Sequence, residues 1–373
     1  VSYSDHMSLS ESFSVLRPHI DEATAAALAR LLARAGATTR SSNFAEAVLA
    51  SAAGGKRFRA LMAHVGWALA SGKPLADASV PHLAAALELY QASALVHDDI
   101  IDHADERRGQ PTPHRALATR HSDAGWIGSS SAFGLNAAIL VGDFLFSAAT
   151  AQADEQALEL RADCVQTFTQ RFADMHAEVA LGQYLDILAE QHPLDPQRAD
   201  ALSADAALEV ALHKSAHYSV VHPGVLGAIC GAPSLAQALP LIEVLETILT
   251  PWGLAFQLRD DDLGVFGDPA VTGKPAGDDL REGKRTVLLA LTWAASSPAE
   301  RTALTEVLGV AEASAEQIAR ATAIVERNGR AAHEAEIARL VEEGQRALDA
   351  SHVDADAASM LRELCDILTA RRA

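Results

Sequence analysis

The chain has 373 residues, of which 30 are basic (Lys and Arg) and 49 are acidic (Asp and Glu), so its formal net charge is −19. This charge argues against nucleic-acid and anionic-membrane partners, because both require a surface with excess positive charge. With 49% hydrophobic residues the chain can bury a large core, which excludes an intrinsically disordered protein.

Cys164, Cys230 and Cys365 lie far apart and show no Cys-x-x-Cys spacing. We therefore expect free thiols in a reducing, cytoplasmic compartment, with no disulfide framework or zinc site built on cysteine. Residues 1–7 are typical of a remnant of expression, and residues 8–373 are expected to form one domain.

Apolar residues recur at helical spacing along almost the whole chain, beginning with one face of residues 83–101. The same periodicity predicts helices over residues 154–190, 204–230, 235–263, 314–327 and 331–350. A longer loop is expected at residues 266–283. No strand-like alternation or fixed-period repeat persists. The prediction is a single all-α domain of roughly ten or more helices.

The most apolar window covers residues 133–146 and contains Asn136 and Asp143. It is shorter than the roughly 20 apolar residues that span a bilayer. We therefore expect a buried helix at this position and no integral membrane segment.

The first basic stretch, Gly-Gly-Lys-Arg-Phe-Arg at residues 54–59, combines a tight turn with three cations. Glycines let the backbone turn closely, and the cations can hold a phosphate. The pattern is not a P-loop, which needs Gly-x-x-x-x-Gly-Lys-Ser/Thr after a strand. On its own, the stretch also fits an ordinary surface turn before a helix.

The strongest feature is His-Asp-Asp-Ile-Ile-Asp at residues 97–102. On a helix, Asp98 and Asp102 project from one face because they are four residues apart. Divalent cations relieve the repulsion between such carboxylates, and Mg²⁺ prefers oxygen ligands. A solvated helix end is the alternative. The interleaved apolar residues and the Asp-Glu-Arg-Arg-Gly tract at residues 105–109 argue against it.

A second acidic cluster, Phe-Gln-Leu-Arg-Asp-Asp-Asp, covers residues 256–262. It precedes a glycine-containing segment ending in Lys274 and a Gly-Lys-Arg-Thr stretch at residues 283–286. Alone, the cluster is as typical of a surface patch as of a site. Together with the first acidic cluster, it favours a metal-bridged phosphate site.

Lysine is rare in this chain, with only five among the basic residues. Lys56, Lys274 and Lys284 lie in the stretches just described, and Lys214 lies in the middle of a predicted helix. Arginine fills nearly every other basic position. Because an ammonium is a compact point charge, this placement favours phosphate binding by the four lysines. Lys73, at a Gly-Lys-Pro turn, is expected to be structural.

Together these stretches resemble the trans-isoprenyl diphosphate synthase (polyprenyl synthetase) family. The resemblance includes further matches at Gly142-Asp143, Gly182-Gln183-x-x-Asp186 and Lys214-Ser215, and it covers roughly residues 16–295. It implies an isoprenoid-synthase-type helical bundle around a deep central cavity, usually as a homodimer. The substrates implied are isopentenyl diphosphate and an allylic prenyl diphosphate of C5 to C15.

Two positions depart from the family pattern. The second acidic motif usually ends in Asp, where this chain has Gly264, and Asp262 is an extra acid. Asp260, the main ligand of that motif by resemblance, is kept, so activity is expected to survive. The family's Lys-Thr pair appears here as Lys214-Ser215, which keeps the hydroxyl.

By resemblance, Asp98 and Asp102 hold two Mg²⁺ ions and Asp260 holds a third, all bridging the allylic diphosphate. Positive side chains would oppose the charge that develops as the C1–O bond breaks. These side chains are Arg107, Lys214, Lys274 and, on a closing loop, Lys284.

The resemblance also implies a second diphosphate site, for isopentenyl diphosphate, at Lys56, Arg59, Gln91 and Arg108. Ser215 and Gln257 would border the allylic cation. The released diphosphate is expected to take the final proton, so no histidine is required. His97 is expected to pack between helices.

Product length is predicted from the helix that carries Asp98, because residues one and two turns earlier should line the growing chain. Ser93 and Ala94 are small, and Tyr90 is the first bulky residue, about 12 Å away along the axis. This spacing favours geranylgeranyl diphosphate (C20). The alternative is that Tyr90 faces a neighbouring helix and another residue ends the pocket.

Other products and other functions remain alternatives. The enzyme could make a farnesyl (C15) product or one of C25 and longer. A class I terpene cyclase would carry an Asn/Asp-x-x-Ser/Thr-x-x-x-Glu motif in place of the second aspartate cluster. A regulatory subunit should have lost the acidic ligands, which this chain keeps.

Overall fold

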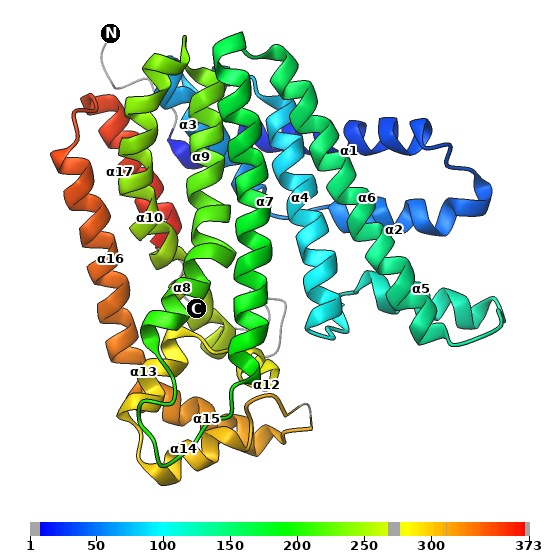
Figure 1. The fold of residues 1–373 in the computed structure, drawn as a ribbon, viewed down its shortest axis with the longest axis vertical. Coiled ribbons are helices and arrows are strands. Elements are labelled where there is room, and N and C mark those ends of the chain that lie inside the picture. The colour runs from blue at the N-terminus through cyan, green and yellow to red at the C-terminus, as the bar shows by residue number, and fades with distance from the viewer. Residues whose placement is uncertain (1–7, 268–276, 311, 370–373) are drawn as a thin grey trace. The chain divides into compact units, whose positions relative to one another are not determined.

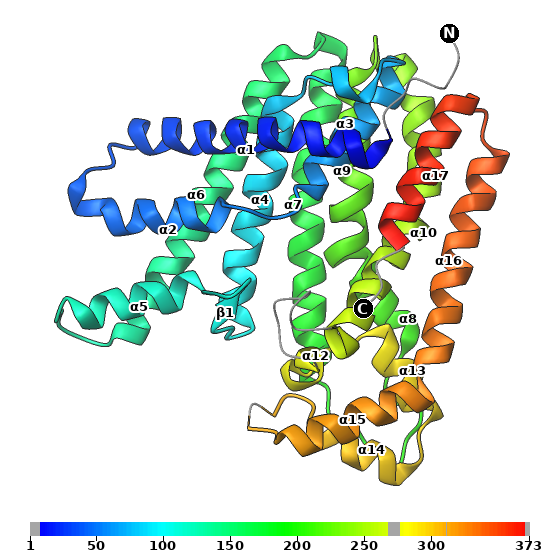
Figure 2. The same ribbon diagram turned by 180° about the vertical axis from the view of Figure 1, so that it is seen from behind.

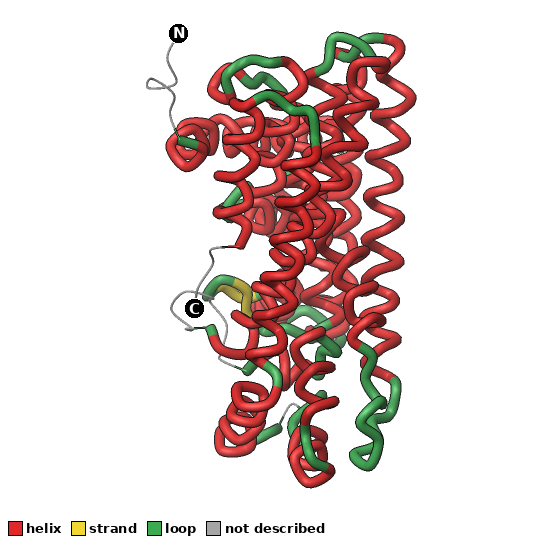
Figure 3. The backbone as a smooth tube through the Cα atoms, turned by 90° about the vertical axis from the view of Figure 1, so that its left-hand side faces the viewer, coloured by secondary structure: helices red, strands yellow, loops and turns green. Residues whose placement is uncertain are grey.

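The computed structural model describes residues 8–267, 277–310 and 312–369. These residues are helical apart from loops and one small hairpin, in which β1 (Glu106–Arg107) pairs antiparallel with β2 (Gln110–Pro111) (Figure 3). The chain forms two compact units, Val1–Phe172 with Pro223–Leu241, and Ala173–His222 with Ile242–Ala373. Each unit therefore draws on separate stretches of the sequence.

The first unit is formed mainly by α1 (Leu9–Arg34), η2 (Thr39–Ser41), α2 (Ser42–Ala52), α3 (Phe58–Ser71), η3 (Leu75–Asp77), α4 (Pro81–Ile101), α5 (Pro113–Asp123) and α6 (Ser130–Glu159). Helices α4 and α6 lie side by side, and α5 packs on α6 (Figure 1). Figure 2 shows α1 followed by α2, and α1 also contacts α4. Leu83 and Leu87 of α4 are fully buried in this unit.

The second unit contains α8 (Ala204–Ala211), the π-helix η4 (Leu212–Val221), α12 (Asp278–Glu282), α13 (Val287–Ala295), α14 (Pro298–Thr305), α15 (Ala315–Asn328), α16 (Arg330–Ala350) and α17 (Ala355–Thr369). Three helices contribute residues to both units: α7 (Ala162–Gln191), α9 (His222–Gly231) and α10 (Leu235–Phe266).

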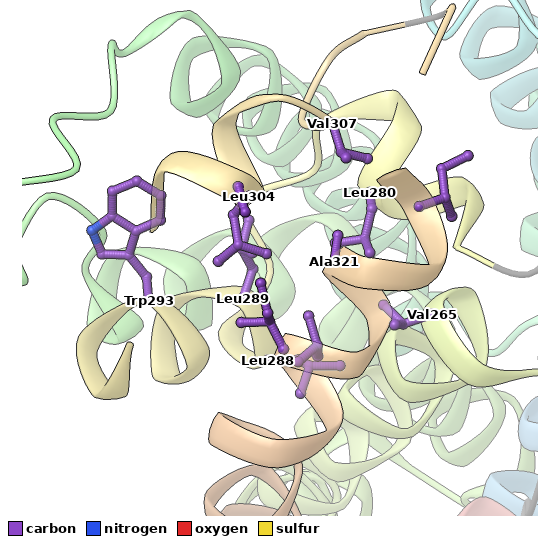
Figure 4. Packing of buried hydrophobic residues seen from close by; sticks show 12 residues of the cluster. Val265, Leu280, Leu288, Leu289, Trp293, Leu304, Val307 and Ala321 are labelled. Atoms are coloured by element: carbon purple, nitrogen blue, oxygen red, sulfur yellow. The ribbon is translucent and has the colours of Figure 1, made fainter. Parts of the chain in front are cut away.

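A hydrophobic cluster within the second unit joins the end of α10 to α12, α13 and α15 (Figure 4). Val265 of α10 and Leu280 of α12 belong to it, and Trp293 of α13 is fully buried in it. This packing holds the short helix α12 beside the C-terminal end of α10. The acidic side chains at the two helix ends are thereby brought close together.

The all-α fold and most of the predicted helices are confirmed. Helical structure runs without a gap over residues 204–231, and α10, α15 and α16 match their predicted ranges within three residues. The prediction for residues 154–190 is wrong in one respect, because Leu160 is extended (φ −78°, ψ 159°) and separates α6 from α7. Helix α12 lies within the segment predicted as a long loop.

Two helices, α6 and α10, are long and apolar enough to cross a membrane by length and composition alone. Helix α6 has 30 residues, so the argument that residues 133–146 are too short to span a bilayer is wrong. In the most apolar 18-residue window of each helix, 39% is buried for α6 and 50% for α10. A helix in the core of a globular protein passes the same test.

Candidate active site

The first acidic stretch forms the last turn of α4, in the first unit. Asp102 caps the helix, and its backbone N–H donates to the carbonyl of Asp98 (2.8 Å). Asp98 and Asp102 are half-buried, whereas Asp99 is buried. The C-terminal end of a helix carries partial negative charge, so carboxylates gathered there need a cation nearby.

Arg107, in β1, supplies such a cation. Its Nε donates to Asp99 Oδ1 (2.6 Å) and its Nη2 donates to Asp98 Oδ2 (3.2 Å). Burial opposes the charge on Arg107, but the Asp99 and Asp98 carboxylates raise its pKa and keep it ionised. Arg107 therefore orients the acids in this structure, and its contact with a diphosphate stays a prediction.

The basic stretch at residues 54–59 lies beside Arg108, within the same unit. A Cβ atom on Gly55 would lie 3.2 Å from Arg108 Nη1, so the guanidinium rests against the glycine backbone. Burial and the neighbouring Arg107, Arg57 and Arg59 lower the pKa of Arg108. Such mutual repulsion among guanidinium groups marks a position where an anion is stabilised. The prediction that Arg59 and Arg108 act together is consistent with this arrangement.

Arg57, one of the three cations expected to be able to hold a phosphate, instead has a structural role. It adopts a left-handed conformation (φ 53°) and its side chain is buried. Its Nε donates to Asp21 Oδ1 (2.6 Å), Nη2 donates to the Ala52 carbonyl (2.9 Å), and Nη1 lies 3.5 Å from Glu88 Oε2. These contacts fix the turn, so exposed Lys56 and half-buried Arg59 on either side are held in place.

Tyr90 and Ser93 of α4 both contact α6. The Tyr90 ring packs edge-on against Phe146 (5.9 Å between centroids), and the Ser93 hydroxyl donates to the Gly142 carbonyl (2.8 Å). Gln91 and Ala94 are half-buried. Tyr90 therefore faces a neighbouring helix, as the alternative reading required, and its role in chain length stays a prediction.

His97 packs between helices, as predicted. Its Nε2 lies 3.3 Å from the Ile139 carbonyl of α6 and 3.8 Å from Asp143 Oδ1.

The second acidic stretch lies on α10, in the second unit, and its three carboxylates have different surroundings. Asp260 is half-buried. Asp261 is buried and accepts a hydrogen bond from Gln257 Nε2 (2.7 Å). Burial, with repulsion from Asp279 and Asp260, raises the pKa of Asp261 to about 8. Gln257, predicted to border the allylic cation, is thus engaged with a neighbouring acid.

Asp262, the extra acid, belongs to the packing of α10 on α16. It is 2% exposed and pairs with Arg330, whose Nε lies 3.2 Å from Asp262 Oδ1. The Arg330 guanidinium also lies over the Phe266 ring, 4.2 Å from its centroid. Asp262 is therefore a structural acid.

Asp279 is the residue that the sequence analysis missed. A Cβ atom on Gly264 would lie 1.9 Å from Asp279 Oδ2, so this carboxylate occupies the space beside the position where the family motif usually has Asp. Asp279 comes from α12, 15 residues later in the chain. The available signal was the Asp-Asp pair at residues 278–279, just before Gly283-Lys284.

Lys214, on the π-helix η4, is held by α7 within the second unit. Its Nζ lies 2.5 Å from Asp186 Oδ2. A Cβ atom on Gly182 would lie 2.3 Å from the Lys214 backbone nitrogen, so only glycine lets the two helices approach this closely. The matches at Gly182 and Asp186 therefore both serve to position Lys214. Ser215 is half-buried.

Lys284 follows α12 and lies beside two acids, 2.5 Å from Glu282 Oε2 and 3.6 Å from Asp279 Oδ1. Lys274 lies outside the described residues, so its predicted role stays a prediction.

The residues present in the two units fit Mg²⁺. Asp98, Asp102, Asp260 and Asp279 offer half-buried carboxylate oxygens, which are the ligands this cation prefers. Lysine or arginine lies beside each acidic group, as a bound diphosphate requires.

Comparison with known proteins gives the family. A polyprenyl synthetase family model matches residues 42–325. The chain is 30% identical to a geranylfarnesyl diphosphate synthase of Aeropyrum pernix over 322 residues, 86% of this chain and 91% of that protein. It is 32% identical to a geranylgeranyl diphosphate synthase of Mycobacterium tuberculosis over 281 residues, 74% and 69% of the two chains.

A solved structure shares the fold over nearly the whole length. The geranylgeranyl pyrophosphate synthase of Corynebacterium glutamicum, complexed with isoprenyl diphosphate and magnesium, superposes with a TM-score of 0.83 at 37% identity. The match covers 98% of this chain and all of that one. The chain therefore belongs to the polyprenyl synthetase family and is a trans-prenyltransferase, as its motifs predict.

Proposed function

We propose that the chain is an Mg²⁺-dependent geranylgeranyl diphosphate synthase. It would condense isopentenyl diphosphate with an allylic diphosphate of C5 to C15 by ionisation, condensation and elimination. The observation that carries this proposal is the end of α4, where Asp98 and Asp102 are half-buried beside Arg107. Such a turn holds divalent cations and a diphosphate together.

Asp98, Asp102 and Asp260 would hold the Mg²⁺ ions, and we propose three of them. Bound Mg²⁺ supplies the positive charge that offsets the leaving diphosphate. Lys214, oriented by Asp186, would add a fixed positive charge that stabilises the same leaving diphosphate. Arg107, Lys274 and Lys284 complete the set that binds the allylic diphosphate.

Asp279 would supply the carboxylate that the family motif places at residue 264. Its Oδ2 lies against Gly264, and Lys284 pairs with its other oxygen. This assignment explains how the departure at Gly264 is compatible with a third ion. It predicts that Asp279, and not its neighbour Asp278, affects the Mg²⁺ requirement.

Isopentenyl diphosphate would bind at Lys56, Arg59, Gln91 and Arg108. The contact of Arg108 with Gly55 and the electrostatic influence of Arg59 on Arg108 support this grouping. Ser215 and Gln257 would border the allylic cation, whose proton passes to the released diphosphate.

The C20 product is supported by the similarity of the chain to geranylgeranyl diphosphate synthases. Tyr90, the first bulky side chain behind Asp98 on α4, packs on Phe146 of α6, and the two rings together would end the pocket. Tyr90→Ala is expected to lengthen products and Ala94→Phe to shorten them, as measured by chromatography of the dephosphorylated alcohols. An unchanged product from both variants would show that other residues set the length.

We further propose that the enzyme is a cytoplasmic homodimer. Helix α6 exposes several large apolar side chains that a second copy could cover, namely Phe133, Ile139, Leu140 and Phe146. The three cysteines are free, which is consistent with a reducing compartment.

The decisive experiment incubates the purified chain with labelled isopentenyl diphosphate and each allylic starter, with and without Mg²⁺. A synthase gives a C20 diphosphate only with Mg²⁺ and both substrates. Cyclic hydrocarbon from an allylic diphosphate alone would indicate a terpene cyclase. No turnover without a second polypeptide would indicate a regulatory subunit.

A further inference from the structure

A cluster of histidines surrounds Glu178, in the second unit. His213 Nδ1 and His217 Nδ1 lie 2.6 and 2.5 Å from Glu178 Oε1, and His222 Nε2 lies 2.7 Å from Oε2. An ionised carboxylate only accepts hydrogen bonds, so each of these nitrogens donates. None of the four residues has a role in the proposed prenyl transfer.

The π-helix explains why the three histidines converge. His213 and His222 are nine residues apart, about two and a half turns of an α-helix, which would place them on opposite faces. The i→i+5 hydrogen bonds of the π-helix η4 give it wider turns than an α-helix has. The step of four residues from His213 to His217 and the step of five from His217 to His222 therefore each return to the same face. π-Helical segments are rare and are often found at functional sites.

The cluster is charged and reachable. Burial opposes ionisation of Glu178, but the hydrogen bonds from His217, His222 and His213 lower its pKa well below the usual range. Glu178, His213 and His217 are 19–26% exposed, so an ion can enter from solvent. His222 is 7% exposed at its side chain, and its Nδ1 has no hydrogen-bond partner among the described residues.

We propose that Glu178, His213 and His217 form a binding site for a transition-metal ion of the Zn²⁺ type. Their ligand atoms all lie within 4.8 Å of one another. Two imidazoles and one carboxylate match the three protein ligands of an open zinc site, whose fourth position takes water. Imidazole ligands favour such metals, whereas the carboxylate clusters favour Mg²⁺.

Occupation requires only small movements. Ligand atoms of a tetrahedral zinc site lie about 3.3 Å apart, given metal–ligand bonds of about 2.0–2.1 Å. The hydrogen-bonded separations of 2.5 and 2.6 Å must therefore open by less than about 1 Å as the ion replaces the bridging protons. His222 would continue to hold the other oxygen of Glu178, as outer hydrogen bonds do for metal-bound carboxylates.

The site lies on the same contact that positions Lys214. Glu178, Gly182 and Asp186 are spaced by four residues and share one face of α7. Gly182 and Asp186 contact Lys214. Glu178 contacts His213 and His217, which lie before and after Lys214 in the sequence. A bound ion would therefore tie η4 to α7 next to Lys214.

The test is calorimetric titration of the full chain with Zn²⁺ in excess Mg²⁺, which occupies the carboxylate sites. The wild-type chain is expected to bind one equivalent. His217→Ala and Glu178→Gln should each weaken binding at least about 10- to 100-fold. The matched controls are His192→Ala and His352→Ala, which remove exposed histidines of the same unit and should leave the affinity unchanged.

Cobalt substitution gives a readout that does not depend on activity. Co²⁺ bound by nitrogen and oxygen in a tetrahedral site produces visible absorption bands, expected in the wild type and absent in His217→Ala. Circular dichroism identifies a variant that has failed to fold, and His213→Ala then replaces it. Equal zinc affinity in the wild type and in a folded ligand variant overturns the proposal, as does an anomalous-scattering peak only at the aspartates.

Discussion

The two acidic stretches of this chain have similar sequences but different structures. At the end of α4, Asp98 and Asp99 share one arginine, Arg107. On α10, Asp261 accepts a hydrogen bond from Gln257, and Asp262 forms an ion pair with Arg330. The first stretch therefore forms one ionic group, whereas the second divides its acids between a site and the packing of α10.

Helix geometry explains the difference. Adjacent residues on an α-helix point about 100° apart, and only positions three or four apart share a face. The first stretch has Asp102 four residues after Asp98, so two carboxylates meet by local structure alone. Four residues after Asp260 stands Gly264, and the second carboxylate comes from Asp279 of α12. The second site is thus assembled by tertiary packing.

The largest effect is expected at Asp98 and Asp102, which helix geometry alone brings together. Asp98→Asn removes a carboxylate that both binds cation and pairs with Arg107, and it should lower kcat by about 10³-fold, about 4 kcal/mol on the barrier. Steady-state kinetics over a range of Mg²⁺ concentrations measures this loss. Asp105→Asn is the matched control, because Asp105 is exposed and its ion pair is with exposed Arg115 (2.6 Å).

An Asp98→Asn variant with near-normal kcat would show that the end of α4 is not a metal site. The thermal midpoint of each variant should be recorded as well, since a loss of fold would lower kcat without bearing on the metal.

A smaller effect is expected at Asp279, the carboxylate that tertiary packing brings to the end of α10. Asp279→Asn should lower kcat about 10- to 100-fold and raise the Mg²⁺ concentration needed for half-maximal rate, because it removes one oxygen ligand. Asp278→Asn makes the same charge change one residue earlier, where the acid pairs with Arg281 (3.2 Å), and should leave the Mg²⁺ dependence unchanged.

Moving the carboxylate from residue 279 to residue 264 tests more sharply whether the two positions are equivalent. Gly264→Asp alone should destabilise the chain, since its Cβ atom would lie 1.9 Å from Asp279 Oδ2. Gly264→Asp combined with Asp279→Ala restores one carboxylate at the family position and should recover part of the activity lost in Asp279→Ala. If the double variant is no more active than Asp279→Ala, the two positions are not equivalent.

The sequence was sufficient where local spacing determines the structure. Periodicity located α10 and α16, and the i, i+4 rule paired Asp98 with Asp102. It was insufficient where contacts are distant. The approach of Asp279 to Gly264 depends on Leu280 packing in the same cluster as Val265. The break at Leu160 has no glycine or proline to mark it, and apolar spacing cannot distinguish the π-helix from an α-helix.

The smallest effect on activity is expected at Asp262, the acid of the second stretch that faces α16. Asp262→Asn weakens a buried ion pair but leaves Arg330 paired with Glu326 (2.7 Å) and stacked on Phe266. The free energy of unfolding should fall by about 1–2 kcal/mol in a denaturant titration, while kcat/KM stays within about twofold. Glu326→Gln, at an exposed ion pair with the same arginine, should cost less than about 0.5 kcal/mol. A loss of activity at Asp262 as large as that of Asp260→Asn would mean that two acids two positions apart on α10 reach the same ligand. The angle of about 200° between them around the helix axis argues against this.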